Sequence, residues 1–499
     1  MRISFPLLML RRYIIPLIIM EKINIQPVKN YGIKATVAQT LATVAQSFLL
    51  IGLGMELTVS TLVIGDLRSS SPQSGFSMTQ NEASWYGSIL FIFHPIGSVM
   101  SGFLQERFGR KRCMILANVP SILGWILLYY TNSITMLYVS TISMGMSIGF
   151  SEAPIISYVG EVTEPRLRGS MASIASMSSM IGMLLISILG SMYHWRIVAL
   201  LSIISPVACM CFIACIPESP MWLIAKGRNE EAEKCLCWLR GWVEPNVVKS
   251  EFHELIHYNE VSGALQGDST SRKSSSILQY LALFKDPLVY RPLRLVMLFF
   301  FFSFILCLIP CRPFLYIILE RVGIFDYHDL ILVLLSVLQI MACIITILTV
   351  NRLGKRFLTL FSFATNTFLL FAFGGYLIAL NNNLISSTRW IPLLIISSIF
   401  FFGAYGLSSM PWILLSEIYS NESRGVATGV SAALSYLLIF ILTKSYLPVE
   451  SLLTLEYSII LFAVIGVFGA LYSYYYLPET ENKTFLEIEE FFALNKRVH

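Results

Sequence analysis

Long apolar blocks recur along this chain, and each is long enough to cross a lipid bilayer as a helix. A helix needs about 20 mainly apolar residues to span the hydrocarbon core, and the sequence holds twelve such blocks. With 56% hydrophobic and 13% charged residues, the chain is far more apolar than a soluble domain that must present a polar exterior. We therefore expect an all-α membrane protein with twelve transmembrane helices. The blocks lie near residues 40–65, 84–105, 113–131, 135–159, 170–192, 196–216, 293–318, 328–350, 357–380, 390–415, 426–448 and 456–477.

One long polar stretch divides the blocks into six and six. It is rich in charge and contains the low-complexity run "GDSTSRKSSS", which is typical of a linker with short helices. Near the N-terminus the apolar run "FPLLMLRRYIIPLIIM" is interrupted by Arg11 and Arg12, so we expect no thirteenth span there, and Met20 is an alternative start of the native chain. The predicted organisation is an N-terminal segment 1–39, a six-helix half 40–216, the linker 217–292, a second six-helix half 293–477 and a tail 478–499.

Basic residues gather in the connections that follow every second block. Cytoplasmic loops of membrane proteins carry an excess of Lys and Arg, so this pattern places both termini and the linker in the cytoplasm. A net charge of +5 is too small to indicate nucleic-acid binding, and the expected partners are the lipid bilayer and a small solute. The basic residues concerned are Arg107, Arg110, Lys111, Arg112, Arg166, Arg168, Arg352, Lys355, Arg356 and Arg424.

Three charged motifs occur twice, in the same order, once in each half of the chain. "GFLQERFGRKR" at 102–112 is matched by "VNRLGKR" at 350–356, "GEVTEPRLRG" at 160–169 by "SEIYSNESRG" at 416–425, and "IPESP" at 216–220 by "LPETE" at 477–481. Two homologous six-helix halves explain this repetition. In transporters built from such repeats, the solute site lies near the bilayer midplane between the halves.

The order of these motifs resembles the major facilitator superfamily, and within it the sugar transporter family, over about residues 40–490. "LRG" at 239–241 and "TKSY" at 443–446 are similar to insect facilitated trehalose transporters. The resemblance implies a cell-membrane carrier that moves a hexose or a trehalose-like disaccharide by alternating access. It leaves open whether transport is facilitative or coupled to protons.

The resemblance further implies that the charged motifs form a contact network on the cytoplasmic face, which we call the latch. Such a network ties the two halves together when the carrier opens outward and must break when it opens inward. Exposed ion pairs contribute only about 0–1 kcal/mol each, which suits a contact that thermal motion releases. The alternative is that these basic residues only set the orientation of the chain in the membrane. Three charged residues of the family pattern are replaced in this chain, by Met221, Asn351 and Thr141. The network therefore has fewer charged side chains than is usual in the family. The expected latch residues are Glu106, Arg107, Gly109, Arg110, Lys111, Glu161, Arg168, Glu218, Arg352, Gly354, Lys355, Arg356, Glu417, Arg424 and Glu479.

The solute site is where this chain departs furthest from the family pattern. The seventh helix of sugar carriers typically reads QQLSGIN, whereas this chain reads "SFILCLI" at 303–309 and so lacks the amides that bind sugar hydroxyls. Each buried, unpaired hydroxyl of a polyol costs about 1–3 kcal/mol. Trp412 is kept from the family pattern and offers a stacking surface for the apolar face of a sugar. The expected solute-binding residues are Ser176, Met180, Ser303, Phe304, Ile309, Trp412, Ser435 and Tyr436.

Three ionisable residues lie near the middle of predicted spans, where such groups are rare and costly: Glu56, His94 and Glu152. Glu56 aligns with the acidic residue of proton-coupled sugar symporters, so we interpret the three as candidates for proton coupling. A carboxylate there can gain and lose a proton as a cavity alternates between wet and dry. The alternative is a permanently protonated Glu56, hydrogen-bonded to His94 or to a backbone carbonyl, with Arg312 reaching the outer headgroups.

Other classes of function fit less well or stay open. The sequence lacks a Walker loop, GxSxG and HExxH, so we do not expect an enzyme. The cysteine pairs Cys235 and Cys237, and Cys307 and Cys311, are not spaced as metal ligands, and we expect neither a metal nor a cofactor. The missing helix-seven motif leaves a non-transporting sensor, an inactive relative or a carrier of a non-sugar small solute as alternatives.

Overall fold

The computed structural model describes residues 31–68, 75–164, 167–267, 287–324, 327–386, 388–419, 424–480 and 491–492. Within these residues every regular element is helical. The predictions for residues 1–30, for Arg166 and for most of the tail fall outside the described residues. The helices of the first half are α3 (Gly32–Leu67), α4 (Gln80–Phe108), α5 (Arg110–Tyr129), α6 (Ile134–Val162), α7 (Arg168–Met192), α8 (Trp195–Ser202) and α9 (Ile204–Cys215).

The rest of the chain repeats this helical pattern after three linker helices. The linker contains α10 (Pro220–Ala225), α11 (Asn229–Leu239) and α12 (Pro245–Gly267). The second half consists of α14 (Pro287–Leu306), the 3-10 helix η3 (Ile309–Phe314), α15 (Leu315–Arg321), α16 (His328–Leu353), α17 (Lys355–Asn381), α18 (Trp390–Gly406), α19 (Met410–Glu417) and α20 (Arg424–Tyr476).

All twelve predicted apolar blocks lie in these helices. Ten helical segments of the described chain are long and apolar enough to cross a membrane. One of them, Ala427–Tyr476 in α20, has 50 residues, or about 75 Å at 1.5 Å per residue, enough for two crossings. The kink between the two crossings is at Thr454, whose φ of 64° is not helical. α7 adds a helix whose apolar part, Met177–Met192, is shorter.

Three spans that we predicted as single helices are broken. The seventh block is interrupted at Leu308, which has a φ of 52°, and continues as a 3-10 helix. Pro310 and Pro313 cause this, because proline has no N–H to donate to the preceding turn. The sixth block divides between α8 and α9, and the tenth between α18 and α19. Apolar content alone does not show such breaks.

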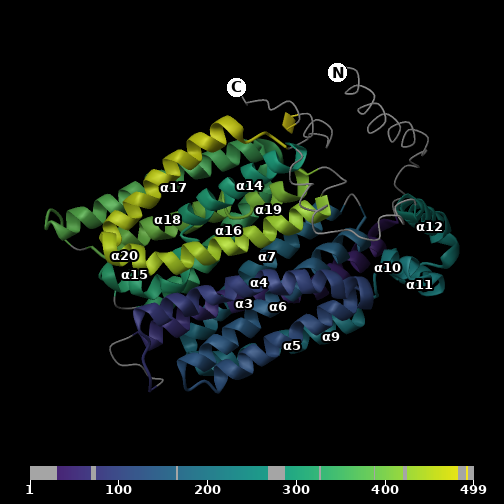
Figure 1. The fold of residues 1–499 in the computed structure, drawn as a ribbon, viewed down its shortest axis with the longest axis horizontal. Helices are drawn as coiled ribbons and strands as arrows, with labels where there is room; N and C mark the ends of the chain where they lie inside the picture. Colours follow the sequence, from purple (N-terminus) through teal and green to yellow (C-terminus); the bar gives the residue numbers. More distant parts are fainter. Residues whose placement is uncertain are drawn as a thin grey trace.

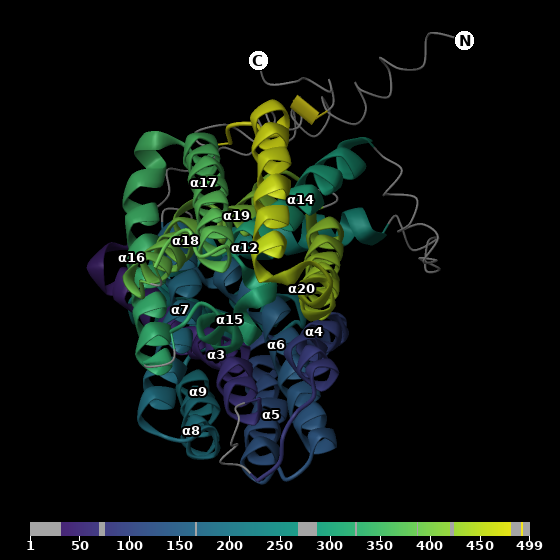
Figure 2. The same cartoon turned by 90° about the vertical axis from the view of Figure 1, so that its left-hand side faces the viewer.

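The helices form two bundles that lie side by side along their length (Figures 1 and 2). In the first bundle α3 packs on α7 and α9, while α6 packs on α4 and α5. In the second, α17 packs on α18 and α20, and α16 packs on α18. The bundles meet where α4 contacts α20, α7 contacts α16, and α3 contacts η3.

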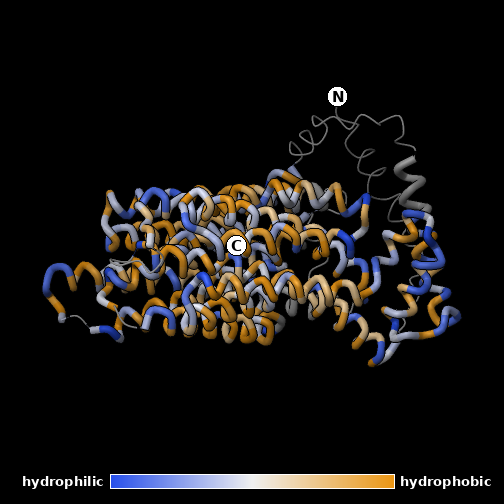
Figure 3. Tube along the Cα trace, turned by 90° about the horizontal axis from the view of Figure 1, so that it is seen from below, coloured by the Kyte–Doolittle hydropathy of each residue, from blue (hydrophilic) through white to orange (hydrophobic). Residues whose placement is uncertain are grey.

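Polarity is distributed along the long axis as a bilayer requires. Figure 3 shows apolar residues through the long middle of the molecule and hydrophilic residues gathered toward its two ends. Large apolar side chains such as Phe103, Phe368 and Leu394 are exposed on the outside of the bundles, where lipid would cover them. The linker helices lie at one end (Figure 1) and have a small core of their own that includes Trp222 and Leu236.

Candidate functional site

The basic motif of the first half joins α4 to α5 through a glycine that no other residue replaces easily. Gly109 has a φ of 96°, and a Cβ there would lie 2.3 Å from Oε2 of Glu218. The other oxygen of Glu218 accepts hydrogen bonds from the backbone N–H groups of Arg110 and Lys111, at 3.1 and 3.0 Å. A carboxylate at the start of α5 satisfies donors that have no partner within the helix and opposes its positive end.

The second half repeats this arrangement with different residues. Gly354, between α16 and α17, has a φ of 80°, and a Cβ there would lie 2.7 Å from Oε2 of Glu479. The carboxylate of Glu479 accepts from the N–H groups of Lys355 and Arg356, at 3.2 and 3.0 Å. In both halves a carboxylate caps the helix that follows the glycine. This shared contact gives the predicted recurrence of the motifs a structural cause.

The charged side chains of the latch form ion pairs within each half. Arg110 lies 3.0 Å from Glu161 and 3.4 Å from Glu106. Lys355 lies 2.7 Å from Glu417. These pairs join helices of the same bundle, so in this conformation they brace each bundle internally, and their action between the halves stays a prediction.

The remaining latch residues lie nearby, at the same end of the bundles. Lys111 donates to the carbonyl of Ala214 at 2.8 Å, and Arg356 donates to that of Tyr474 at 2.8 Å. Arg107 lies over the ring of Phe108. Arg352 is exposed in the last turn of α16, whereas the side chains of Arg168 and Arg424 are outside the described part.

At the end opposite the latch, the two halves are in direct contact. Ser84 of α4 donates to the carbonyl of Lys444 at 2.8 Å, and the ammonium of Lys444 donates to Asn81 at 3.1 Å. Thr61 of α3 donates to the carbonyl of Arg312 in η3 at 3.0 Å. Several hydrogen bonds between the halves lie at this end, so the molecule is closed here.

An aromatic group from the second half lies at the level where the halves meet. The ring of Trp412 is 5.0 Å from Phe300 and 5.6 Å from Tyr436, centroid to centroid. Phe304 is buried and packs on Phe300 at 5.2 Å. Ser303 is buried, and its hydroxyl has no hydrogen-bond partner. The structure thus brings Trp412 and Tyr436 together, as a shared solute site requires.

The other predicted solute-binding residues are less clearly grouped. Ser435 is fully buried, and its hydroxyl donates to the carbonyl of Ala432 in its own helix. Ile309 begins η3, and Met180 is half-buried on α7. The side chain of Ser176 is outside the described part.

His94 and Glu152 form a pair across α4 and α6. Nε2 of His94 lies 3.2 Å from the carboxylate of Glu152. The ring of Tyr436, from the other half, stacks on His94 with centroids 3.5 Å apart and planes inclined by 22°. The hydroxyl of Tyr436 also lies next to the carboxylate of Glu152. These residues therefore form a polar contact between the halves in the middle of the membrane span.

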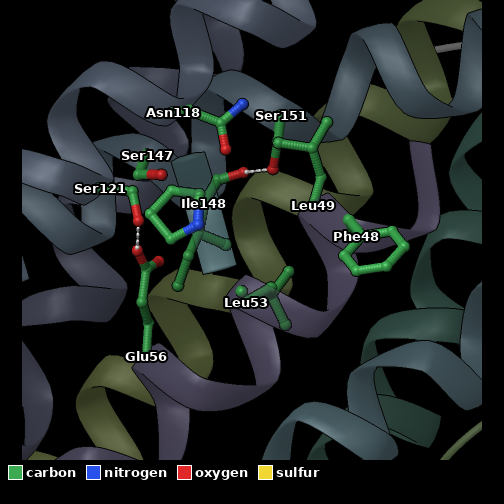
Figure 4. A pocket seen from close by; sticks show the side chains of 11 residues that line it. Phe48, Leu49, Leu53, Glu56, Asn118, Ser121, Ser147, Ile148 and Ser151 are labelled. Atoms are coloured by element: carbon green, nitrogen blue, oxygen red, sulfur yellow. Dashed lines mark hydrogen bonds between the residues drawn. The ribbon is translucent and has the colours of Figure 1, made fainter. Parts of the chain in front are cut away.

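Glu56 lies apart from this pair, in a small polar chamber inside the first bundle. Its carboxylate accepts a hydrogen bond from Ser121 at 2.5 Å. Figure 4 shows Asn118, Ser147 and Ser151 around the same space, which holds about one water molecule. A second small pocket on the other side of Glu56 reaches Tyr86 and the interface with η3.

The contact between Glu56 and His94 that we considered as an alternative is not made. Glu56 bonds Ser121, and His94 bonds Glu152 instead. Arg312 does not reach outward to headgroups, because its guanidinium donates to Gln339 of α16 at 3.0 Å.

Sequence analysis missed Phe300, Ser121 and Gln339. Phe300 belongs to a run of four phenylalanines, and hydropathy does not tell which ring contacts Trp412. Ser121 and Gln339 are polar residues within apolar blocks, which is a signal that a systematic search for buried polar side chains would find.

The cysteines of the linker behave as ordinary thiols. Cys235 and Cys237 are free, and burial raises the pKa of both thiols. The described residues contain no group of three or more His, Cys, Asp or Glu side chains placed to hold a metal ion.

The sequence matches the model of a family described as sugar (and other) transporter over residues 31–492. Similar proteins include the facilitated trehalose transporter Tret1 of Culex quinquefasciatus, 26% identical over 470 residues, which are 93% of this chain and 87% of the relative. Tret1 of Polypedilum vanderplanki is 27% identical over 459 residues, which are 90% of this chain and 87% of the relative.

Solved structures of the same fold include the xylose transporter XylE from E. coli in a partially occluded inward open conformation. It superposes with a TM-score of 0.69 at 19% identity, covering 90% of this chain and 100% of that chain. The proton:xylose symporter XylE bound to 6-bromo-6-deoxy-D-glucose gives a TM-score of 0.67 at 19% identity, with 92% and 99% covered. At this identity the likeness shows the fold, which is that of the major facilitator superfamily.

Proposed function

Because this chain belongs to the sugar (and other) transporter family, we propose that it carries a sugar across a cell membrane by alternating access. The observation that carries the proposal is the arrangement of two repeated bundles around a central polar and aromatic contact. The bundles are in contact at one end, through Ser84, Lys444 and Thr61, while the ion pairs at the latch end stay within each bundle. A carrier of this kind must break the contacts at one end and form contacts at the other.

The basic ends of the helices support an orientation with both termini and the linker helices in the cytoplasm. In that orientation the contact between Ser84 and Lys444 closes the outside, and the conformation described here faces inward. Glu161 and Arg110 would then pair within the first bundle while the cytoplasmic side is open, and the halves would approach there when the carrier turns outward.

A hexose or a trehalose-like disaccharide is the proposed solute. The relatives with sequence similarity are named for trehalose, and the structural neighbours for xylose. Trp412 supports this choice because a flat aromatic ring suits the apolar face of a sugar. No enzymatic step is part of the proposal.

Uptake of labelled solutes into oocytes tests the function. We expect oocytes that express the protein to take up trehalose or D-glucose faster than water-injected oocytes, with saturation at high concentration. The panel includes sorbitol and a choline salt, so that carriers of polyols or organic cations are recognised. Surface protein with no uptake of any of these would contradict the proposal and support a non-transporting relative.

We further propose that transport is coupled to protons through Glu56. Its carboxylate is 2% exposed and has a serine hydroxyl as its partner. It lies between the polar chamber and the pocket that reaches η3 of the other half, so movement of η3 changes its access to water. Tyr86 is the other titratable residue that lines these two pockets.

Coupling predicts a pH dependence that Glu56→Gln removes. We expect accumulation of the transported sugar to be severalfold higher at about pH 5.5 than at about pH 7.5, because the inward proton gradient drives uptake only if Glu56 is protonated outside. A protonophore should abolish the accumulation. Uptake is measured with and without protonophore in the wild type, in Glu56→Gln, and in Glu320→Gln, which changes an exposed carboxylate. Equilibration that neither pH nor protonophore affects would leave facilitated diffusion.

A further inference from the structure

We propose that Glu152 is the residue that recognises the hydroxyl groups of the sugar, and that His94 and Tyr436 hold its carboxylate in place until the sugar arrives. The inference rests on the proposed function and deepens it. In this inference Glu152 and His94 take part in sugar binding, whereas proton coupling is assigned to Glu56. Four observations carry it, concerning position, accessibility, an unsatisfied atom and the neighbouring aromatic ring.

The position of the pair is where the two halves meet. His94 on α4 and Glu152 on α6 belong to the first bundle, and Tyr436 on α20 belongs to the second. Ionisable side chains at this depth are rare, and they usually face a bundle interior or a water-filled path. Neither residue is needed to cap a helix or to brace the latch.

The two members of the pair differ in accessibility. The side chain of His94 is 1% exposed, whereas that of Glu152 is 16% exposed. The carboxylate is therefore the member that an incoming solute can reach. His94 supports it from behind, because its Nε2 lies 3.2 Å from the carboxylate. That bond fixes the orientation in which Glu152 can receive further hydrogen bonds.

His94 also has a buried atom without a partner. Its Nδ1 makes no hydrogen bond, and buried polar atoms of this kind are uncommon in folded proteins. The ring of Tyr436 covers His94 in the present conformation. When the halves part, Tyr436 moves with α20, and both the carboxylate and this nitrogen become accessible to a solute.

The hydroxyl of Tyr436 occupies the place that a sugar hydroxyl would take. It lies next to the carboxylate of Glu152 across the interface, so a sugar that binds Glu152 must displace it. Trp412 lies 5.6 Å from Tyr436 and supplies an apolar surface beside that ring. The polar part of the site thus comes from the first half and the aromatic part from the second, so the sugar contacts both halves.

The chemistry favours a neutral sugar with neighbouring hydroxyls. A carboxylate has two acceptor oxygens, which suit two adjacent O–H donors, and bonds to a charged acceptor are stronger than those between neutral groups. Glu152 would thereby replace the amides that are absent from α14 and η3, where Ser303, Phe304 and Ile309 stand. Sugar phosphates and uronates would be repelled by the same charge.

The test measures the KM for D-glucose and trehalose in Glu152→Gln and Tyr436→Phe, with Glu320→Gln as the control on an exposed carboxylate. We expect Glu152→Gln to raise the KM about 10- to 100-fold, because it loses charge-assisted hydrogen bonds. Tyr436→Phe keeps the ring and removes the competing hydroxyl, so its KM should be equal to or lower than that of the wild type. His94→Ala should raise the KM. His94→Asn keeps a hydrogen-bond donor, so its KM should lie between that of His94→Ala and that of the wild type.

Deoxy sugars identify the hydroxyls concerned. Among 2-, 3-, 4- and 6-deoxy-D-glucose, those lacking a hydroxyl bound by Glu152 should bind the wild type weakly. In Glu152→Gln, the affinity for these deoxy sugars should be little lower than for D-glucose. The hydrogen bond that the missing hydroxyl would make is already lost in the mutant. Thermal stabilisation of the purified protein by each sugar provides a readout without transport.

The outcomes separate the two proposals. If the wild type neither transports nor is stabilised by any sugar, the proposed function fails. If the wild type transports sugar but Glu152→Gln has an unchanged KM, or if the deoxy effects in the mutant are as large as in the wild type, the role of Glu152 is overturned. Sugar uptake in Glu152→Gln that loses only its pH dependence would instead assign the residue to proton coupling.

Discussion

We expect Trp412→Ala to lose most sugar uptake while the protein still reaches the cell surface. The ring contacts Phe300 and Tyr436, of which Tyr436 stacks on His94 of the other half, and it is only half-buried. Aromatic contacts contribute about 0.5–1.5 kcal/mol beyond the area they bury. Loss of the ring removes this contact with the sugar and also the support for Tyr436, so we expect uptake to fall by about tenfold or more.

Surface biotinylation and uptake are measured together, with two further variants. Trp390→Ala removes a tryptophan that is 77% exposed at the start of α18, and it should leave uptake near the wild-type level. Trp412→Phe keeps an aromatic face and should retain part of the activity. Normal uptake in Trp412→Ala would show that the ring only packs against its neighbours.

We expect Gly182→Val to prevent folding of the first bundle. A Cβ at Gly182 would lie 2.0 Å from the carbonyl oxygen of Ile51 and 2.8 Å from its carbonyl carbon. Both atoms belong to the backbone of α3, which cannot rotate away as a side chain can. Opposite them, a Cβ at Gly54 would lie 1.9 Å from the carbonyl oxygen of Ser179 on α7. Small residues allow membrane helices to approach this closely, so the change forces α3 and α7 apart.

The matched control is Gly375→Val on α17, where a Cβ would meet no atom within 4 Å. We expect Gly182→Val to remove most of the folded protein from the membrane, seen as loss of the monodisperse peak in size-exclusion chromatography after detergent extraction. Overpacking usually costs about 1–3 kcal/mol and sometimes more. Gly375→Val should elute as the wild type does. Equal stability of the two variants would show that α3 and α7 do not cross as described.

Helix seven illustrates a limit of reasoning from apolar blocks. The sequence shows one apolar run from 293 to 318, and hydropathy favours a single span. The structure has α14, a 3-10 turn and α15, because Leu308 adopts a left-handed conformation before two prolines. The prolines were visible in the sequence, but whether proline bends a helix or breaks it depends on neighbouring helices that satisfy the freed carbonyls.

The three ionisable residues of the membrane region illustrate a second limit. In the sequence Glu56, His94 and Glu152 are equivalent, since each interrupts an apolar block. In the structure Glu56 bonds Ser121 in a chamber of its own, while His94 and Glu152 pair with each other and meet Tyr436. Their partners are 58 or more positions away along the chain, so only the crossing of helices decides which groups meet.

The sequence by itself determined the membrane-spanning architecture, the two-fold repetition and the family. These follow from local hydropathy and from motifs such as Gly109 and Glu218, which recur in the same order as Gly354 and Glu479. The tertiary structure alone decided which end of the bundles is closed, where the long spans break and which buried polar groups are neighbours. The physical reason is that apolar content fixes which residues enter the bilayer, whereas helix rotation and close packing, which involve residues far apart in the chain, fix what each side chain contacts there.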